Sequence, residues 1–553
     1  MVPSSRLSDG VNPRWRGMAM RRTLFCFAIL AAFAAGAPAQ LSGPLSGTLP
    51  ADTYSVVGPI SVDDGDTLLI EAGAELRFEG AYGFTILGRL RALGAEGDSI
   101  RFVNAPGHSW WGTHFVGLPL ANESRMQYCV VEGSSRGGIF AQNCEVVIAH
   151  SSIRGNTTDQ DYGAGIYCNS LPSPTISHCI IEDNIAPHYG GGIGIYYSAP
   201  NIDHCLIRNN HSVYGGGGIY ADQGFSATAA VIEDCTIAGN SCDRSGGGIR
   251  CYRGGIAIRR CHIAENISTG YFGGAIYSDC VEDGSPSMLT TVEHSVIAGN
   301  AGLGAVWMDF ASASIAYCTL SGNAAGGWGA FTSYHGDSSS VVGVIIEGTG
   351  GYGIYPVASP GIVKYCDFHG NSLGDLHGPS LPGFGELVGT NANGDSCDVY
   401  MNIFEPPLFV DPMGGDYHLQ AGSACIDAGD PGGPLDPDGT TADMGALYYD
   451  QSSSRLEQAT SLLTPVVAAY PNPFARQTTI AFILTRAQWV AIEVFNLSGA
   501  KVRTFTRGVC GAGRHQVVWD GRDSRSRRLA AGVYFVRLDG GAGEATRRVT
   551  LLR

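Results

Sequence analysis

One pattern recurs through residues 126–371 and constrains the fold more than any other feature. Each copy has a branched aliphatic residue, a Cys flanked by aliphatics, an Asn, and then a Gly run closed by Ile and an aromatic. Clear copies read TISHCIIEDN then GGGIG, NIDHCLIRNN then GGGGIY, and VIEDCTIAGN then GGGIR. A repeated unit of this kind predicts a stacked architecture in which each repeat contacts only its neighbours.

The apolar runs within each unit are short and rich in β-branched residues, and no run keeps a helical period. Strands this short cannot bury a face alone. If each repeat forms one coil, every strand pairs with its copy in the next coil, at about 4.8 Å. The sequence therefore predicts an all-β parallel β-helix whose like residues form columns along its axis.

Three columns are expected to organise the solenoid. The inward apolar column is Ile139, Ile166, Ile193, Ile219, Ile249, Ile276, Val306, Phe331 and Ile354. The Cys column is Cys129, Ser151, Cys179, Cys205, Cys235, Cys261, Ser295, Cys318, Gly343 and Cys366. The Asn column is Asn156, Asn184, Asn210, Asn240, Asn266, Asn300, Asn323 and Asn371. We expect these Asn side chains to lie at a corner, to bond from coil to coil, and to tolerate left-handed backbone angles.

The combination of I-x-x-C-x-I-x-x-N with GGGIY resembles the right-handed parallel β-helix repeats of the pectin-lyase-like superfamily, over roughly residues 56–449. The run from FEPPLFVDP to DMGALYYD resembles the coil that closes secreted members of that group. This architecture carries lyases, hydrolases, epimerases and adhesins, so the resemblance implies a fold and leaves the activity open.

The last segment changes character, with short alternating strands between Gly and Asp turns that predict a small β-sandwich. Its pieces YPNPF, NLSGAKVRTF, GRHQVVWDGRD and AAGVYFVRLD resemble the immunoglobulin-like C-terminal domains of type IX secretion sorting substrates and of the flagellar hook-capping protein. The resemblance implies export or anchoring through outer-membrane secretion machinery, although TRRVTLLR departs from the usual Lys-rich tail.

Arg21, Arg22 and the apolar run that follows, with APA before Gln40, predict a secretory signal peptide. The predicted domains are therefore a signal peptide (1–39), a β-helix (40–449), a linker (450–465) and an Ig-like sorting or anchoring domain (466–553). Within the β-helix we distinguish first coils (40–125), repeats (126–371) and a closing region (372–449).

The chain carries 50 Asp and Glu against 34 Lys and Arg, and its basic residues are concentrated after residue 466. An acidic body disfavours nucleic-acid binding, and no mature segment is apolar enough to span a membrane as a helix. We expect a monomeric protein, secreted by a bacterium or held on the outer side of its outer membrane.

One place after each inward residue stands an outward one, and six of these are aromatic. They are Phe140, Tyr167, Tyr220, Tyr277, Trp307 and Tyr355, interrupted by Gly194, Arg250 and Thr332. Rings at coil spacing could stack on sugar rings, so these residues are the predicted carbohydrate-binding site. The alternative is that the rings pack on one another and only support the wall.

Two further groups could hold a metal. A row of imidazoles, His150, His178, His204 and His294, precedes the Cys column. Asp234 and Arg260 interrupt it, so packing at the surface or at a corner is the favoured alternative to metal binding. In LDPDGTTADMG, Asp436, Asp438 and Asp443 have the spacing of a calcium loop but lack its terminal Glu, so a structural turn is the alternative. Calcium is the one cofactor the sequence suggests.

The cysteine count is 16, and loss of Cys26 with the signal leaves an odd number. The column Cys have parallel Cβ directions, so we expect buried free thiols there. Cys397 and Cys425 lie outside the column and are the better candidates for a disulfide.

No catalytic residue can be assigned from the sequence. A glycosidase needs two carboxylates on one face. Candidate pairs combine Glu182 or Asp183 with Glu132, Asp203 or Asp234, and none stands out from the acidic background. The sequence favours a carbohydrate-binding or adhesive structural protein, with a polysaccharide lyase or glycoside hydrolase acting from a groove on the wall as the alternative.

Overall fold

The structure is a computed structural model that describes residues 38–553 except for the segments listed next. The excepted residues are 119–122, 162, 225–228, 271, 281–288, 335–338, 357–361, 378–380, 452–466, 471–473, 475, 485–487, 497–499, 511–512, 526, 541–542 and 552–553. Most of the predicted signal peptide and linker therefore lies outside the described residues. Ala39, after which cleavage is expected, is the first residue of strand β1 (Ala39–Pro44).

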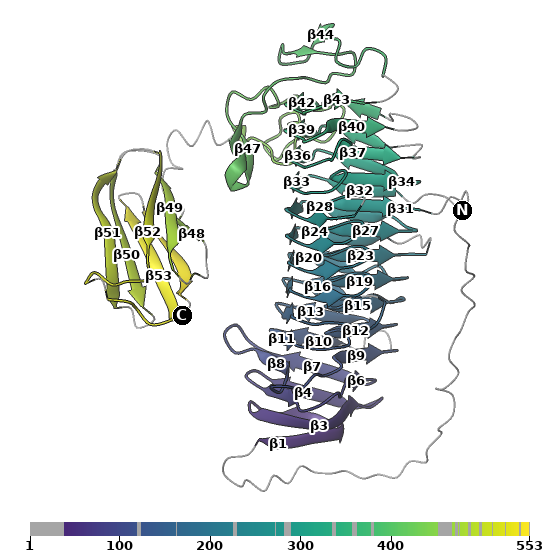
Figure 1. Ribbon diagram of the computed structural model, residues 1–553, viewed down its shortest axis with the longest axis vertical. Helices are drawn as coiled ribbons and strands as arrows, with labels where there is room; N and C mark the ends of the chain where they lie inside the picture. The colour runs from purple at the N-terminus through teal and green to yellow at the C-terminus, as the bar shows by residue number, and fades with distance from the viewer. Residues whose placement is uncertain are drawn as a thin grey trace.

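The predicted parallel β-helix is confirmed, with three walls of short strands stacked in register (Figure 1). In the third wall, for example, Ile166 pairs with Ile193 and Ile193 with Ile219. Strand β3 (Thr53–Val62) is long enough to run along the second and third walls, because it pairs with both β5 and β6. All these pairings are parallel, since each strand meets its copy one coil away.

The first wall contains β2 (Gly47–Leu49), β4 (Thr67–Glu71), β7 (Arg89–Leu93), β10 (Ser124–Gln127), β13 (Val146–Ala149), β16 (Thr175–Ser177), β20 (Asn201–Asp203), β24 (Ala230–Glu233), β28 (Ile256–Arg259), β32 (Leu289–Glu293), β35 (Ser312–Ala316), β38 (Ser340–Val342) and β41 (Ile362–Lys364). The second wall contains β5 (Glu75–Phe78), β8 (Ile100–Asn104), β11 (Cys129–Glu132), β14 (Ser152–Arg154), β17 (Ile180–Glu182), β21 (Leu206–Arg208), β25 (Thr236–Ala238), β29 (His262–Ala264), β33 (Val296–Ala298), β36 (Thr319–Ser321), β39 (Ile345–Glu347) and β42 (Asp367–His369).

The third wall contains β6 (Phe84–Ile86), β9 (Thr113–Val116), β12 (Ile139–Gln142), β15 (Ile166–Asn169), β19 (Ile193–Tyr196), β23 (Ile219–Asp222), β27 (Ile249–Tyr252), β31 (Ile276–Asp279), β34 (Val306–Asp309), β37 (Gly329–Tyr334), β40 (Tyr352–Pro356) and β43 (Gly374–Leu376). A short corner sheet between the second and third walls contains β18 (Ile185–Ala186), β22 (His211–Ser212), β26 (Ser241–Cys242) and β30 (Ile267–Ser268).

The predicted columns form the core, and the Asn column also ties the coils together. Asn184 accepts from the backbone N–H of Asn156 at 3.0 Å, and its own amide donates to the carbonyl of Ile153 at 3.0 Å and to Asn210 at 2.9 Å. The residue before each Asn holds the left-handed angle, for example Asp183 with φ 56°. The expectation that the Asn itself adopts that angle is wrong, because its side chain points inward to make the ladder.

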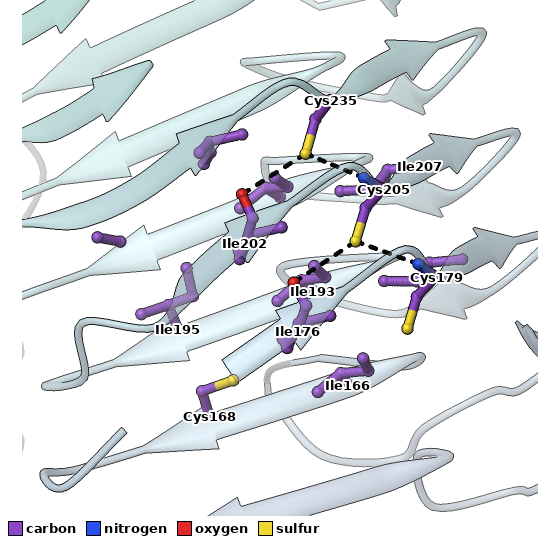
Figure 2. Packing of buried hydrophobic residues seen from close by; sticks show 14 of the residues in the cluster. Ile166, Cys168, Ile176, Cys179, Ile193, Ile195, Ile202, Cys205, Ile207 and Cys235 are labelled. Atoms are coloured by element: carbon purple, nitrogen blue, oxygen red, sulfur yellow. Dashed lines mark hydrogen bonds between the residues drawn. The ribbon is translucent and has the colours of Figure 1, made fainter. Parts of the chain in front are cut away.

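The Cys column is buried beside the inward Ile residues (Figure 2). Cys205 Sγ accepts from the N–H of Cys179 at 3.5 Å and donates to the carbonyl of Ile176 at 3.6 Å. Burial raises the pKa of Cys318 and Cys366 to about 12, so these thiols stay protonated. One assignment is wrong by a residue. Gly343 lies beside Tyr317 at the left-handed corner, and the next residue, Val344, takes the Cys position.

A closing segment, residues 397–449, folds back over the outer face of the second wall. It contains β46 (Phe409–Asp411), the 3-10 turn η1 (Pro412–Gly414) and β47 (Asp416–Leu419), and the hairpin β44 (Gly389–Thr390) with β45 (Ser396–Cys397) leads into it. Its apolar side chains cover outward residues such as Val296 and Ile345 and form a second core. The proposed Cys397–Cys425 disulfide is absent. Cys425 Sγ instead donates to Asp367 at 3.4 Å, and Cys397 contacts Met401.

The C-terminal domain is the predicted β-sandwich of two antiparallel sheets. One contains β48 (Val467–Tyr470), β49 (Thr478–Leu484) and β52 (Gly513–Trp519), and the other contains β51 (Lys501–Cys510), β50 (Gln488–Asn496), β53 (Gly532–Gly540) and β54 (Gly543–Leu551). Trp519, Ile492 and Val536 are fully buried between them. In the part of the chain that the structure describes, no helix has the length and apolar character needed to span a membrane.

Candidate functional site

The six predicted carbohydrate-binding aromatics lie in one column on the outer face of the third wall. The column runs Phe140, Tyr167, Gly194, Tyr220, Arg250, Tyr277, Trp307, Thr332 and Tyr355. Its middle is covered, since Tyr220 is 3%, Tyr277 5% and Trp307 1% exposed. Their ring faces are therefore not open to solvent. Phe140, Tyr167 and Tyr355, nearer the ends, are half-buried.

A second layer of rings covers this column, and each of its members stands directly before a Gly. The ring centroids are 4.4 Å apart for Tyr189 and Tyr220, 4.7 Å for Phe272 and Trp307, and 4.6 Å for Trp328 and Tyr355. Gly190 makes the fold-back possible, because it has φ +66° and a Cβ there would lie 2.6 Å from the carbonyl oxygen of Ile193. An aromatic directly before the Gly run was the signal for this layer, and the sequence interpretation missed it.

Charged residues are enclosed in the same wall. Arg250 donates to both carboxylate oxygens of Asp279, at 2.8 and 3.3 Å, and to the carbonyl of Tyr214 at 3.1 Å. Burial raises the pKa of Asp279, and Arg250 opposes that shift. Asp309 pairs with Asp279 in the next coil. These carboxylates, at the fourth position of β31 and β34, were absent from the pairs considered from sequence.

A pocket of about 640 Å³ lies where the closing segment meets the corner between the first and second walls. Asp234, Arg260 and His294 line it from that corner, His262 from the second wall, and Tyr448 from the closing segment. The segment is held in place by hydrogen bonds, for example from the Ala446 N–H to Thr319 Oγ1 at 3.0 Å and from the Gly445 N–H to the carbonyl of Gly343 at 2.8 Å. The volume of the pocket is within the roughly 300–1,000 Å³ typical of small-molecule sites.

The pocket combines an ion pair with uncharged polar groups. Arg260 donates to Asp234 at 2.9 and 2.8 Å and thereby lowers the pKa of that carboxyl. Burial lowers the pKa of His262 and of His294, so both imidazoles are neutral at pH 7. Burial also raises the pKa of Asp443, to about 7. Polar donors and acceptors of low net charge therefore surround the cavity, next to the phenol of Tyr448.

The predicted calcium-loop carboxylates accept hydrogen bonds from the protein itself. Asp443 accepts from the N–H groups of Asp427 and Tyr449, at 2.7 and 2.5 Å, and Asp436 accepts from the N–H of Asp443 at 2.8 Å. Asp438 accepts from the Thr440 N–H and hydroxyl at 3.1 and 2.7 Å. This is the arrangement of a structural turn. Calcium binding by Asp436, Asp438 and Asp443 stays a prediction.

The predicted histidine row is a stack on the corner beside the Cys column. Each member has a positive φ, and centroids are 4.7 Å apart for both His150 with His178 and His178 with His204. His294 lies apart from them, stacked on Tyr317 at 5.4 Å. Glu182 and Glu132, which the sequence suggested as a pair of glycosidase carboxylates, form ion pairs with basic residues instead. Glu182 pairs with Arg208 at 2.7 Å, and Glu132 pairs with Arg154 at 3.0 Å.

Comparisons with known proteins agree with the two-part fold. A family model described as "Right handed beta helix region" matches residues 116–280, and one described as "FlgD Ig-like domain" matches residues 474–544. The chain thus contains a right-handed β-helix followed by an Ig-like domain. No curated protein matches it. Among solved structures, "Crystal structure of pectate lyase Pel9A" is similar with a TM-score of 0.34 and 14% identity, over 69% of this chain and 89% of that chain.

Proposed function

We propose that this chain is a secreted or cell-surface β-helix protein that binds a carbohydrate in the pocket beneath the closing segment. The observation that carries the proposal is the pocket of about 640 Å³, which is lined by the Arg260–Asp234 pair and by Tyr448. Sugars are bound by planar polar pairs together with aromatic faces. Because His262 and His294 are neutral and further carboxyls adjoin the pocket, a neutral glycan fits better than a polyanion.

The test is binding of a neutral and an acidic oligosaccharide panel to the purified chain, with R260M and Y448A as the variants. We expect each variant to weaken binding by about tenfold, because R260M removes a charged hydrogen-bonding group and Y448A removes an aromatic ring. R208M is the matched control, because Arg208 forms a similar exposed pair with Glu182 on the second wall outside the pocket. Binding that R260M and Y448A leave unchanged would remove the pocket from the proposal.

We further propose that residues 466–553 direct export or anchoring, which rests on the Ig-like match and on the resemblance to sorting domains. Deletion of these residues should abolish surface display and leave a folded β-helix in the periplasm, on the inner side of the outer membrane. Unchanged secretion and display of the truncated chain would contradict this role.

A polysaccharide lyase or glycoside hydrolase is the second candidate, favoured by Asp279 and Asp309 on adjacent coils of the third wall beside Arg250. It ranks second because Arg250 already binds both oxygens of Asp279. New reducing ends or unsaturated products from a polysaccharide panel, lost in D279N and D309N, would place this candidate first.

A further inference from the structure

Three metal-ligand side chains converge on the corner between the first and second walls, next to the pocket but not among the residues that line it. His178, Asp203 and His204 each offer one ligand atom, and these atoms all lie within 4.8 Å of one another. His204 Nδ1 is 3.2 Å from Asp203 Oδ2. This is the one such group among the residues that the structure describes.

The repeat itself creates the convergence. His178 and His204 occupy the same left-handed position in adjacent coils, with φ 52° and 51°. Their backbones therefore hold the same angle one coil apart, and the rings are stacked with an interplanar angle of 2°. Asp203 ends strand β20 and directly precedes His204, so it reaches the same point from the first wall. All three side chains are exposed or half-buried.

We propose that His178, His204 and Asp203 bind a divalent transition-metal ion of the zinc class. Two imidazoles and one carboxylate are a donor set for zinc and its neighbours, at about 2.0–2.2 Å, and leave coordination positions open. Ligand atoms within 4.8 Å need only a small approach, which exposed side chains can make by rotating about their side-chain bonds. Calcium is excluded as the preferred ion, because it takes six or more oxygen ligands.

The surroundings supply further donors and charge. His150 lies on one side of the group, 4.7 Å from His178 between ring centroids, and can add a third imidazole. On the other side stands Asp234, whose carboxylate is held by Arg260. The site is therefore confined to one segment of the corner, bounded by an ion pair.

The experiment measures Zn²⁺ binding to the purified full chain by calorimetry and the absorption spectrum of bound Co²⁺. The variants are H178N and H204N, in which Asn tolerates the left-handed angle, and D203N, in which Asn keeps the size of the Asp side chain. H294N is the matched control, because His294 occupies the same corner position with φ 45° but stacks on Tyr317. Thermal unfolding with and without Zn²⁺ gives an independent readout, as an ion bound only by the folded state raises Tm.

We expect one Zn²⁺ per chain, at least about tenfold weaker binding in H178N and H204N, and a smaller loss in D203N. H294N should bind as the unsubstituted chain does. A Co²⁺ spectrum with thiolate absorption would overturn the proposal, because it would place the ion on Cys. Absence of Zn²⁺ binding, or equal losses in H294N and H204N, would also overturn it and leave the imidazoles as a stack only.

Discussion

The repeated coils and the closing segment bury similar apolar side chains by different means. In the coils, a buried residue lies on its own copy one coil away, as Ile193 lies between Ile166 and Ile219. In the closing segment, contacts join residues remote in sequence, such as Ala446 and Thr319. The difference teaches where a cavity can arise. Columns of like residues seal one another, whereas a cavity forms where a non-repeating segment meets the columns.

The largest expected difference between the two regions is in their response to pH. Asp367 lies under the closing segment at 0% exposure, and burial raises its pKa to about 8. The folded chain therefore holds a proton there that the unfolded chain releases above about pH 4. Stability from this group should be fully present below pH 4 and fall as pH rises to about 8, by at most about 6 kcal/mol at about 1.4 kcal/mol per pKa unit.

The substitution D367N mimics the protonated acid, since its oxygen can still accept from the Glu405 N–H, as Asp367 does at 3.1 Å. It should flatten the pH dependence of the free energy of unfolding and stabilise the chain above pH 8. D430N is the control, because Lys364 holds the pKa of Asp430 below its usual range and its contribution has the opposite sign. A D367N profile parallel to that of the unsubstituted chain would show that Asp367 does not hold the proton as argued.

The aromatic column gives the next largest effect. Trp307 is 1% exposed and contacts Phe272 and Trp328, so W307A should lower the free energy of unfolding by about 3–4 kcal/mol, as expected for a buried ring. F140A, at the half-buried end of the column, should cost about half as much. Urea unfolding measures both. If W307A left stability unchanged and removed glycan binding instead, the column would be a platform and the comparison would reverse.

The sequence predicted what the register dictates. Ile, Cys and Asn recur at fixed places in each coil, so pairing fixes their columns and their burial. The Cys column contains one misassigned residue, Gly343. Either Gly343 or the adjacent Val344 could have continued the column in the next coil, and the strand pairing places Val344 there. The closing segment has no repeated pattern, so its contact with Thr319 could not be inferred from the sequence. The pocket beneath this segment could not be inferred either.

The solvent exposure of the aromatic column could not be predicted from the periodic pattern either. A column one place after the inward Ile points outward, and that part of the prediction is confirmed. Whether an outward ring is exposed depends on what covers it, and the cover comes from Tyr189 and its counterparts before the Gly runs. The alternating pattern of a strand predicts which way a side chain points, but not how much of that side chain is exposed to solvent.

The smallest effect should come from the Cys column, where the chain already contains its own substitution. Ser151 and Ser295 take the Cys position in two coils, and their hydroxyls accept from the N–H groups of Cys129 and Cys261 at 3.0 Å. Cys205 Sγ accepts from Cys179 in the same way. C205S keeps that acceptor and should cost under about 1 kcal/mol.

C205A removes the acceptor and leaves a buried N–H unpaired, at a cost of about 1–2 kcal/mol. The order of the two variants in urea unfolding is the decisive result, because both shorten the side chain within the same core. If C205A were as stable as C205S, the thiols would act as apolar filling alone. The columns would then be held by shape and by the Asn ladder, with no polar link through sulfur.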